Sequence, residues 1–213
     1  MRLVDSLERM LVPGWNRRSS EGAVAAAEAH PWLDVAVGVH PHDAADVDDA
    51  AWAWFVEVAA DPRVVAIGET GLDFDRAFSP PEAQRHNLRR NLRLALETGK
   101  PAILHCRSAA GRRDAQDELV GELRAAGFGG SPVRDAFGAR PPAVIHSYSG
   151  PPDYAGALLE LGLVFSFGGL VYRAGEEASA EVVRRVPAER LLVETDAPYL
   201  AAPSAPRRRN EPA

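Results

Sequence analysis

Ile67-Gly68-Glu69-Thr70-Gly71-Leu72-Asp73-Phe74 is the stretch that decides the fold. The apolar run that enters it, Val64 to Ile67, has the composition of a buried strand, and it stops at a glycine-bounded turn that carries two carboxylates. A carboxylate at the end of a buried strand must be paired, hydrogen-bonded or bound to a cation. The turn therefore predicts a functional site at a strand end.

Three further apolar runs also deliver polar side chains where they end. In chain order, Ile103-Leu104 leads into His105, Val144-Ile145 into His146, and Leu191-Leu192-Val193 into Glu194-Thr195-Asp196. Imidazoles and carboxylates are the ligands of Zn²⁺, Mn²⁺ and Mg²⁺, and additional oxygen ligands favour the harder ions. We therefore predict that Glu69, His105, His146 and Asp196 form a metal site at one face of a parallel sheet.

Seven apolar runs alternate with helical patterns along the chain, and the linkers between them are short. This alternation predicts one parallel α/β domain over residues 1–213. Polar residues follow most of the strands, which favours a (β/α) TIM barrel of the metal-dependent hydrolase type. The alternative is an open doubly wound sheet, which would bind its ligand at a single switch point, but no Gly-rich phosphate-binding fingerprint is present.

Local signals predict several element boundaries. Ser19 or Ser20 is expected to cap the first helix, and residues 79–82 have the spacing of a capping box with proline in the first turn. Gly99 is expected at the left-handed end of the helix that follows. The Gly- and Pro-rich stretch 128–142 is predicted to be a surface loop.

Composition limits the class of protein. The 213 residues carry a formal net charge of −6, which argues against a protein that coats nucleic acid electrostatically. The single cysteine, Cys106, excludes an intrachain disulfide and a cysteine-type structural zinc site. No signal peptide or membrane-spanning segment is recognisable in the sequence. We expect a cytoplasmic protein with no membrane association, and we infer no stable protein partner.

Other polar residues near the strand ends have a functional and a structural interpretation. His40 follows another apolar run and could serve the site or make a backbone hydrogen bond in a loop. Arg107 lies two residues after His105 and could bind phosphate or form a surface ion pair. Asp73 could hold the turn or orient a histidine behind a metal. Cys106 alternates away from His105 and is expected in the core.

Five segments, in order, resemble the motifs of the TatD-related metal-dependent DNases. They are Gly38-Val39-His40-Pro41-His42, Gly68-Glu69-Thr70-Gly71-Leu72-Asp73, Leu104-His105-Cys106-Arg107, His146-Ser147-Tyr148-Ser149-Gly150 and Glu194-Thr195-Asp196-Ala197-Pro198-Tyr199-Leu200. The resemblance covers nearly the whole chain from Leu11 onward, and Arg209-Asn210-Glu211-Pro212 extends it. It implies an amidohydrolase-like TIM barrel that cleaves phosphodiesters, most directly DNA, with metal-activated water.

The resemblance also implies roles for individual residues. Glu69 would bridge two divalent ions, each Mg²⁺, Mn²⁺ or Zn²⁺. His105 and His146 would hold one ion, while Asp196 would hold the other and position or deprotonate the attacking water. Arg107 and His40 would contact the substrate phosphate.

The sequence departs from the family at both ends. Members begin with a strand that bears an Asp-x-His-x-His segment, and nothing like it precedes Leu11; they also continue beyond the position of Ala213. We therefore expect seven of eight strands, a barrel with unpaired strand edges, and one or two bound ions. The alternatives to a deoxyribonuclease are a truncated, catalytically weak or inactive metal-binding relative, and a hydrolase of another ester or amide.

Overall fold

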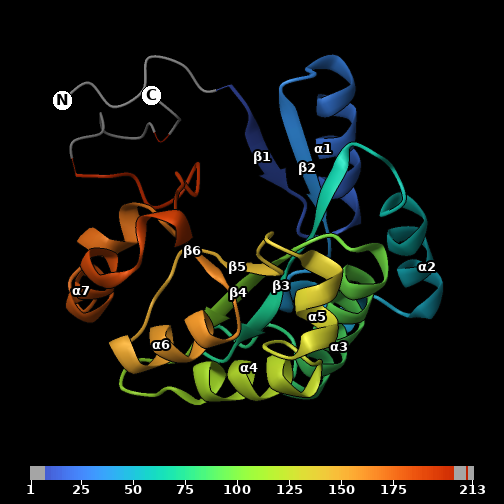
Figure 1. Cartoon of the computed structure of the whole chain (residues 1–213). Helices are drawn as coiled ribbons and strands as arrows, with labels where there is room; N and C mark the ends of the chain where they lie inside the picture. Colours follow the sequence, from blue (N-terminus) through green and yellow to red (C-terminus); the bar gives the residue numbers. More distant parts are fainter. Residues whose placement is uncertain (1–7, 204–209, 211–213) are drawn as a thin grey trace.

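Seven parallel strands, adjacent in chain order, form one curved sheet with helices along its outer side (Figure 1). This arrangement is seen in a computed structural model that describes residues 8–203 and 210. The strands are β1 (Met10–Pro13), β2 (Leu33–Val37), β3 (Val64–Asp73), β4 (Ala102–Arg107), β5 (Ala143–Ile145), β6 (Val164–Phe167) and β7 (Leu191–Val193). The predicted α/β class and barrel-type strand order are confirmed.

Each strand is joined to the next by a segment that contains at least one helix. The α-helices are α1 (Arg17–Ala29), α2 (Asp49–Val58), α3 (Pro81–Thr98), α4 (Asp114–Ala125), α5 (Ser131–Phe137), α6 (Pro152–Glu160) and α7 (Glu177–Arg185). Three 3₁₀-helices are η1 (Pro41–Asp46), η2 (Gly169–Tyr172) and η3 (Ala188–Arg190). Among the described residues, no helix combines the length and the apolar composition needed to cross a membrane.

The two faces of the sheet bury different residues. Val35 and Val37 of β2 join the large core that lies between the strands and the outer helices. Ala36, between them, points the other way and meets Ala66 and Ile103 inside the curved sheet. Side chains alternate between the faces of a strand, so polar residues on the inner face are directed towards the barrel axis.

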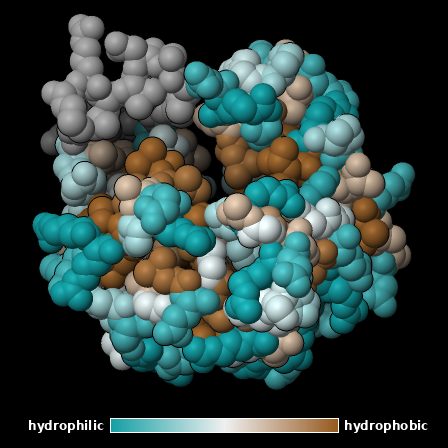
Figure 2. Space-filling model, in the orientation of Figure 1, coloured by the Kyte–Doolittle hydropathy of each residue, from teal (hydrophilic) through white to brown (hydrophobic). Residues whose placement is uncertain are grey.

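The first and last strands leave the sheet open within the described part of the chain. There β1 pairs only with β2, and β7 pairs only with β6. Leu11 of β1 and both Leu192 and Val193 of β7 are exposed. Figure 2 shows apolar surface around a hollow between the part that contains β1 and α1 and the part that contains α7. The expected unpaired strand edges are therefore present in these residues.

Two boundary predictions for the first half of the chain are wrong. Asn16, not Ser19 or Ser20, caps α1; its side chain accepts from the Ser19 N–H, and Ser19 reciprocates as the third helical residue of a capping box. Pro80 occupies the N-cap of α3 without a side-chain cap bond. Ser79 instead donates to the carbonyl of His42 and accepts from the Ala45 N–H. The Gly99 prediction is confirmed, since its φ is 64°.

The predicted loop over residues 128–142 contains α5, so that prediction is also wrong. Gly130 is the N-cap and Pro132 falls in the first turn, where proline is tolerated. Val133 and Phe137, four residues apart, are both buried. Burial of this short apolar face outweighs the weak local propensity of a Gly- and Pro-rich segment.

Candidate metal centre

The predicted site residues meet at the carboxyl end of the sheet. Glu69 and His105 lie within β3 and β4, His146 directly follows β5, and Asp196 follows β7. Three imidazoles, those of His105, His40 and His146, face one atom, Glu69 Oε1. It lies 3.1 Å from His105 Nδ1, 3.5 Å from His40 Nε2 and 3.8 Å from His146 Nε2.

A shift in strand register directs Glu69 inward. Ile67 pairs with Ala102, but Thr70 pairs with Leu104, so β3 has one residue more than β4 over this interval. Such a bulge interrupts the alternation of side chains and bends the strand. Counted from Ile67, which lies in the outer core, alternation would place Glu69 among the helices. The extra residue turns it to the inner face, beside His105.

Close approach of two glycines brings the ends of β2 and β3 together. A Cβ on Gly38 would lie 2.5 Å from the Cα of Gly68, so no side chain fits there without movement of the backbone. Gly38 lies two residues before His40, and Gly68 directly precedes Glu69. The small residues therefore allow His40 and Glu69 to approach each other.

His105 lies between two carboxylates. Its Nδ1 faces Glu69, and its Nε2 lies 3.2 Å from Oδ2 of the fully buried Asp73. Asp73 also accepts from the backbone N–H groups of Asp75 and Arg76. Asp73 therefore has both of the roles considered from sequence: it holds the turn, and it orients the imidazole of His105. With Nε2–H donated to Asp73, the Nδ1 lone pair is free for a cation.

His146 also lies between Glu69 and a supporting carboxylate. Its Nδ1 lies 2.7 Å from Glu194 Oε2, an atom that also accepts from the Ser166 hydroxyl. With Nδ1–H donated to Glu194, Nε2 lies 3.5 Å from Asp196 Oδ1 and faces Glu69. With a cation bound, each histidine would present a lone pair to the centre and donate a proton to its supporting carboxylate.

The site shifts the protonation equilibria of its members. Burial alone would raise the pKa of the Glu69 carboxyl, but His146, His105 and His40 together hold this pKa well below its usual range. Burial would lower the pKa of His146, but Glu69, Asp196 and Glu194 raise it well above its ordinary value. Burial lowers the pKa of His40 despite Glu69. A neutral His40 beside an ionised Glu69 is the protonation state that a metal requires.

The donor set fits a divalent cation. Ligand atoms of His40, Glu69 and His105 all lie within 4.8 Å of one another. His146 Nε2 lies 3.8 Å from Glu69 Oε1 and 3.5 Å from Asp196 Oδ1, which connects Asp196 to this group. Neutral imidazoles and carboxylates suit Zn²⁺ and Mn²⁺, and the oxygen donors also suit Mg²⁺. The geometry groups His40 with the potential ligands, whereas the sequence predicted that it would contact phosphate.

Two polar contributors are absent from the site predicted from sequence. Glu194 lies directly after β7 on the inner face, two residues before the predicted ligand Asp196. His42 was noted beside His40 without a role, and its Nε2 lies 2.7 Å from Asp73 Oδ2. Inward alternation at a strand end could have indicated Glu194, whereas the contact of His42 depends on the turn into η1.

Arg107 lies beside these contacts, as its spacing from His105 predicts. Its Nε is 3.2 Å from Asp73 Oδ2, and 38% of its side chain is exposed. The guanidinium is therefore anchored at one nitrogen and accessible to solvent. Cys106, between His105 and Arg107, packs into the outer core as predicted.

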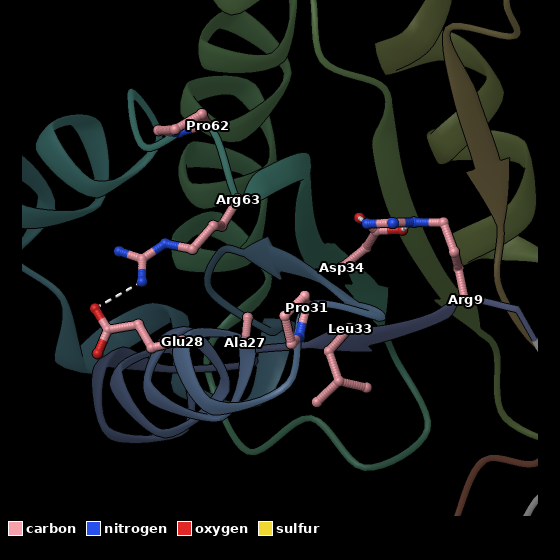
Figure 3. Close-up of a pocket in the computed structure, with 8 residues that line it drawn as sticks. All are labelled: Arg9, Ala27, Glu28, Pro31, Leu33, Asp34, Pro62 and Arg63. Atoms are coloured by element: carbon pink, nitrogen blue, oxygen red, sulfur yellow. Dashed lines mark hydrogen bonds and ion pairs between the residues drawn. The ribbon is translucent and has the colours of Figure 1, made fainter.

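A separate recess of roughly 440 Å³ lies at the amino end of the strands (Figure 3). Its arginines are already paired, with Arg63 bound to Glu28 at 2.6 Å and Arg9 bound to Asp34. Both guanidinium groups are therefore engaged by carboxylates and do not offer a site for an anionic ligand. The recess also lies at the opposite end of the strands from Glu69 and the histidines around it. It does not compete with the Glu69 centre as a candidate site.

Comparison with known proteins connects this geometry to a family. A family model described as TatD related DNase matches residues 4–213. The chain is 33% identical to the uncharacterized metal-dependent hydrolase YabD of Bacillus subtilis strain 168, over 98% of this chain and 75% of that protein. It is 37% identical to the 3′-5′ ssDNA/RNA exonuclease TatD of Escherichia coli K12, over 96% of this chain and 74% of that protein.

Solved structures share the fold. YjjV, a TatD homolog from Escherichia coli K12, superimposes with a TM-score of 0.79 at 27% identity, over 97% of this chain and 74% of YjjV. A TatD family hydrolase from Entamoeba histolytica gives a TM-score of 0.75 at 23% identity, over 91% of this chain and 62% of that one. The latter supports the fold alone.

Proposed function

The chain belongs to the TatD-related DNase family, and we propose from this premise that it is a metal-dependent exonuclease acting on single-stranded nucleic acid. It is a metal-dependent hydrolase of ester bonds. The convergence of three histidines on Glu69 Oε1 is the observation that carries the proposal. Single-stranded DNA or RNA as substrate and 3′-5′ polarity are proposed from the named activity of its relatives.

We assign the cation ligands around Glu69, whose Oε1 faces three imidazoles. His105 and His146 would hold the cation through imidazole nitrogens and Asp196 through an oxygen, and His40 is close enough to contribute as well. A bound divalent cation would act as a Lewis acid on the phosphate and make water more acidic. One or two ions can be accommodated by this assignment, and titration with Mg²⁺, Mn²⁺ and Zn²⁺ would identify the preferred metal.

The protein's own side chains then position the water, the phosphate and the cation ligands. Asp196 positions the attacking water and accepts its proton at a carboxylate oxygen. Arg107, held at Nε by Asp73, donates its accessible N–H groups to the phosphate. Asp73 and Glu194 keep the two imidazoles in the orientation and tautomer that direct their lone pairs to the centre.

The alternatives are less well supported. A truncated, catalytically weak or inactive metal-binding relative is not favoured, because the family and the relatives carry the names of nucleases and metal-dependent hydrolases. Hydrolysis of a different ester or amide suits the fold equally, but the family and the named relatives favour a phosphodiester. We propose one hydrolase domain over the chain, acting in the cytoplasm, where its free buried thiol would remain reduced.

The test is cleavage of an end-labelled single-stranded oligonucleotide, DNA and RNA in parallel. We expect stepwise shortening from the 3′ end that requires a divalent cation and stops in EDTA. Asp196→Asn should lower the rate by about 10²- to 10⁴-fold, as loss of a general base does. Asp61→Asn, which removes a carboxylate paired with Arg63 at the amino end of the sheet, is the matched control. Cleavage in EDTA, or an Asp196→Asn variant as active as the control, would overturn the proposal.

A further inference from the structure

Phe78 is one of the exposed aromatic residues of the described chain. It lies in the segment that joins β3 to α3, and 71% of its surface is accessible. Burial of a phenylalanine ring stabilises a fold, and this position forgoes most of that stabilisation. Scattered surface aromatics are ordinary, so exposure alone assigns no role. Its position and anchoring supply the remainder of the argument.

The turn around Phe78 is fixed at both ends. On one side, Asp73 is fully buried and accepts from the N–H groups of Asp75 and Arg76. On the other side, Ser79 is buried and donates to the carbonyl of His42. Gln84 of α3 connects the two ends, since its amide donates to the carbonyls of Asp73 and Ser79. Phe78 is therefore held in place by its backbone while its side chain remains exposed.

The ring of Phe78 lies against a histidine beside the site. It meets the His42 ring edge-to-face, with centroids 4.7 Å apart and planes at 84°. The His42 ring in turn lies 6.2 Å from the His105 ring. The His42 ring thus lies between Phe78 and His105, a proposed metal ligand. Arg76, two residues before it, and Arg107, beside Asp73, are partly exposed cations at the same end of the sheet.

We propose that Phe78 is a stacking platform for a nucleobase of the substrate strand next to the cleaved phosphate. This inference rests on the proposed function. A flat apolar ring beside cationic groups matches the alternation of base and phosphate in single-stranded nucleic acid. Stacking tolerates any base, because every base has a π-face, so the platform would give strand affinity without sequence preference. In a duplex, the bases are already stacked on their neighbours and are not available to Phe78.

Binding measurements with and without bases test the platform. The Asp196→Asn background prevents turnover, and anisotropy of a labelled oligonucleotide in Mn²⁺ gives the dissociation constant. We expect Phe78→Ala to weaken binding by about 5- to 150-fold, equivalent to about 1–3 kcal/mol per stacked base. Phe78→Trp should retain the affinity. Trp32→Ala removes a 45% exposed aromatic at the amino end of β2 and should leave the affinity unchanged.

An abasic oligonucleotide of the same length separates stacking from charge and folding. Phe78→Ala should bind it as the parent does, so that the difference between the two proteins disappears. Equal weakening on both oligonucleotides, no weakening on either, or failure of Phe78→Trp to restore affinity would overturn the inference. Cleavage is measured separately in the protein with Asp196 intact, so absence of turnover would reject the proposed function without deciding this binding result.

Discussion

Glu194→Gln tests how the fold orients its metal ligands. The Glu194 carboxylate lies 2.7 Å from His146 Nδ1, and burial, which would raise its pKa, is outweighed by His146, which lowers it. Glu194 is therefore ionised at neutral pH. Glutamine keeps the shape but removes the charge that fixes the Nδ1–H tautomer of His146. Loss of such a supporting partner weakens metal affinity by about 10- to 100-fold, or about 1.4–2.8 kcal/mol.

Calorimetric titration of the EDTA-treated protein with Mn²⁺ measures this effect. The matched control is Glu122→Gln, which breaks the ion pair with Arg89 on the outer helices and leaves the centre intact. A second readout is the metal-free pKa of His146, which burial lowers and three carboxylates raise. Removal of one carboxylate should lower this pKa, so the imidazole loses its proton at a lower pH. Unchanged Mn²⁺ affinity together with an unchanged His146 pKa would refute the orienting role of Glu194.

Two further predictions concern packing of β3 and β4. Gly71→Ala would place a Cβ 1.9 Å from the backbone oxygen of His105 at a φ of 147°, so the free energy of unfolding in urea should fall by about 3 kcal/mol or more. The control is Gly22→Ala, which has open space around it in α1 and should leave this free energy unchanged or raise it. Equal effects of the two substitutions would contradict the packing argument. Burial raises the pKa of the Cys106 thiol to about 12 from 9.0. The native thiol should therefore react roughly 1,000-fold more slowly with a disulfide reagent at pH 8 than the thiol of the unfolded chain does. Because the unfolded thiol ionises first, the free energy of unfolding should fall as the pH rises above about 9. Equal thiol reactivity in buffer and in urea would contradict the burial of Cys106.

The strand order and the end of the sheet that holds the site could be predicted from sequence. Apolar runs that end in polar residues carry that information, because parallel strands deliver their carboxyl ends to one side. Glu69, His105, His146 and Asp196 were selected on this basis, and their side chains do converge. Their roles as ligands remain predictions.

The finer geometry depends on features that have no local sequence signal. The direction of Glu69 comes from a register shift between β3 and β4, and strict alternation from Ile67 predicts the opposite face. The helix α5 forms because Val133 and Phe137 find a core to pack against, although the segment's composition is typical of a loop. His42 reaches Asp73 only because η1 turns the chain back towards β3. Each of these is decided by tertiary packing.

Above all, we propose that one carboxylate, Glu69, is shared by the imidazoles that would hold the cation. The most direct test of this proposal is the divalent-cation affinity of the metal-free protein measured for Glu69→Gln, His105→Ala, His146→Ala and Asp196→Asn under the same conditions. Because three histidine nitrogens face Glu69 Oε1, Glu69→Gln should lose more affinity than any other single variant. A loss for His105→Ala that equals or exceeds the loss for Glu69→Gln would contradict the shared role.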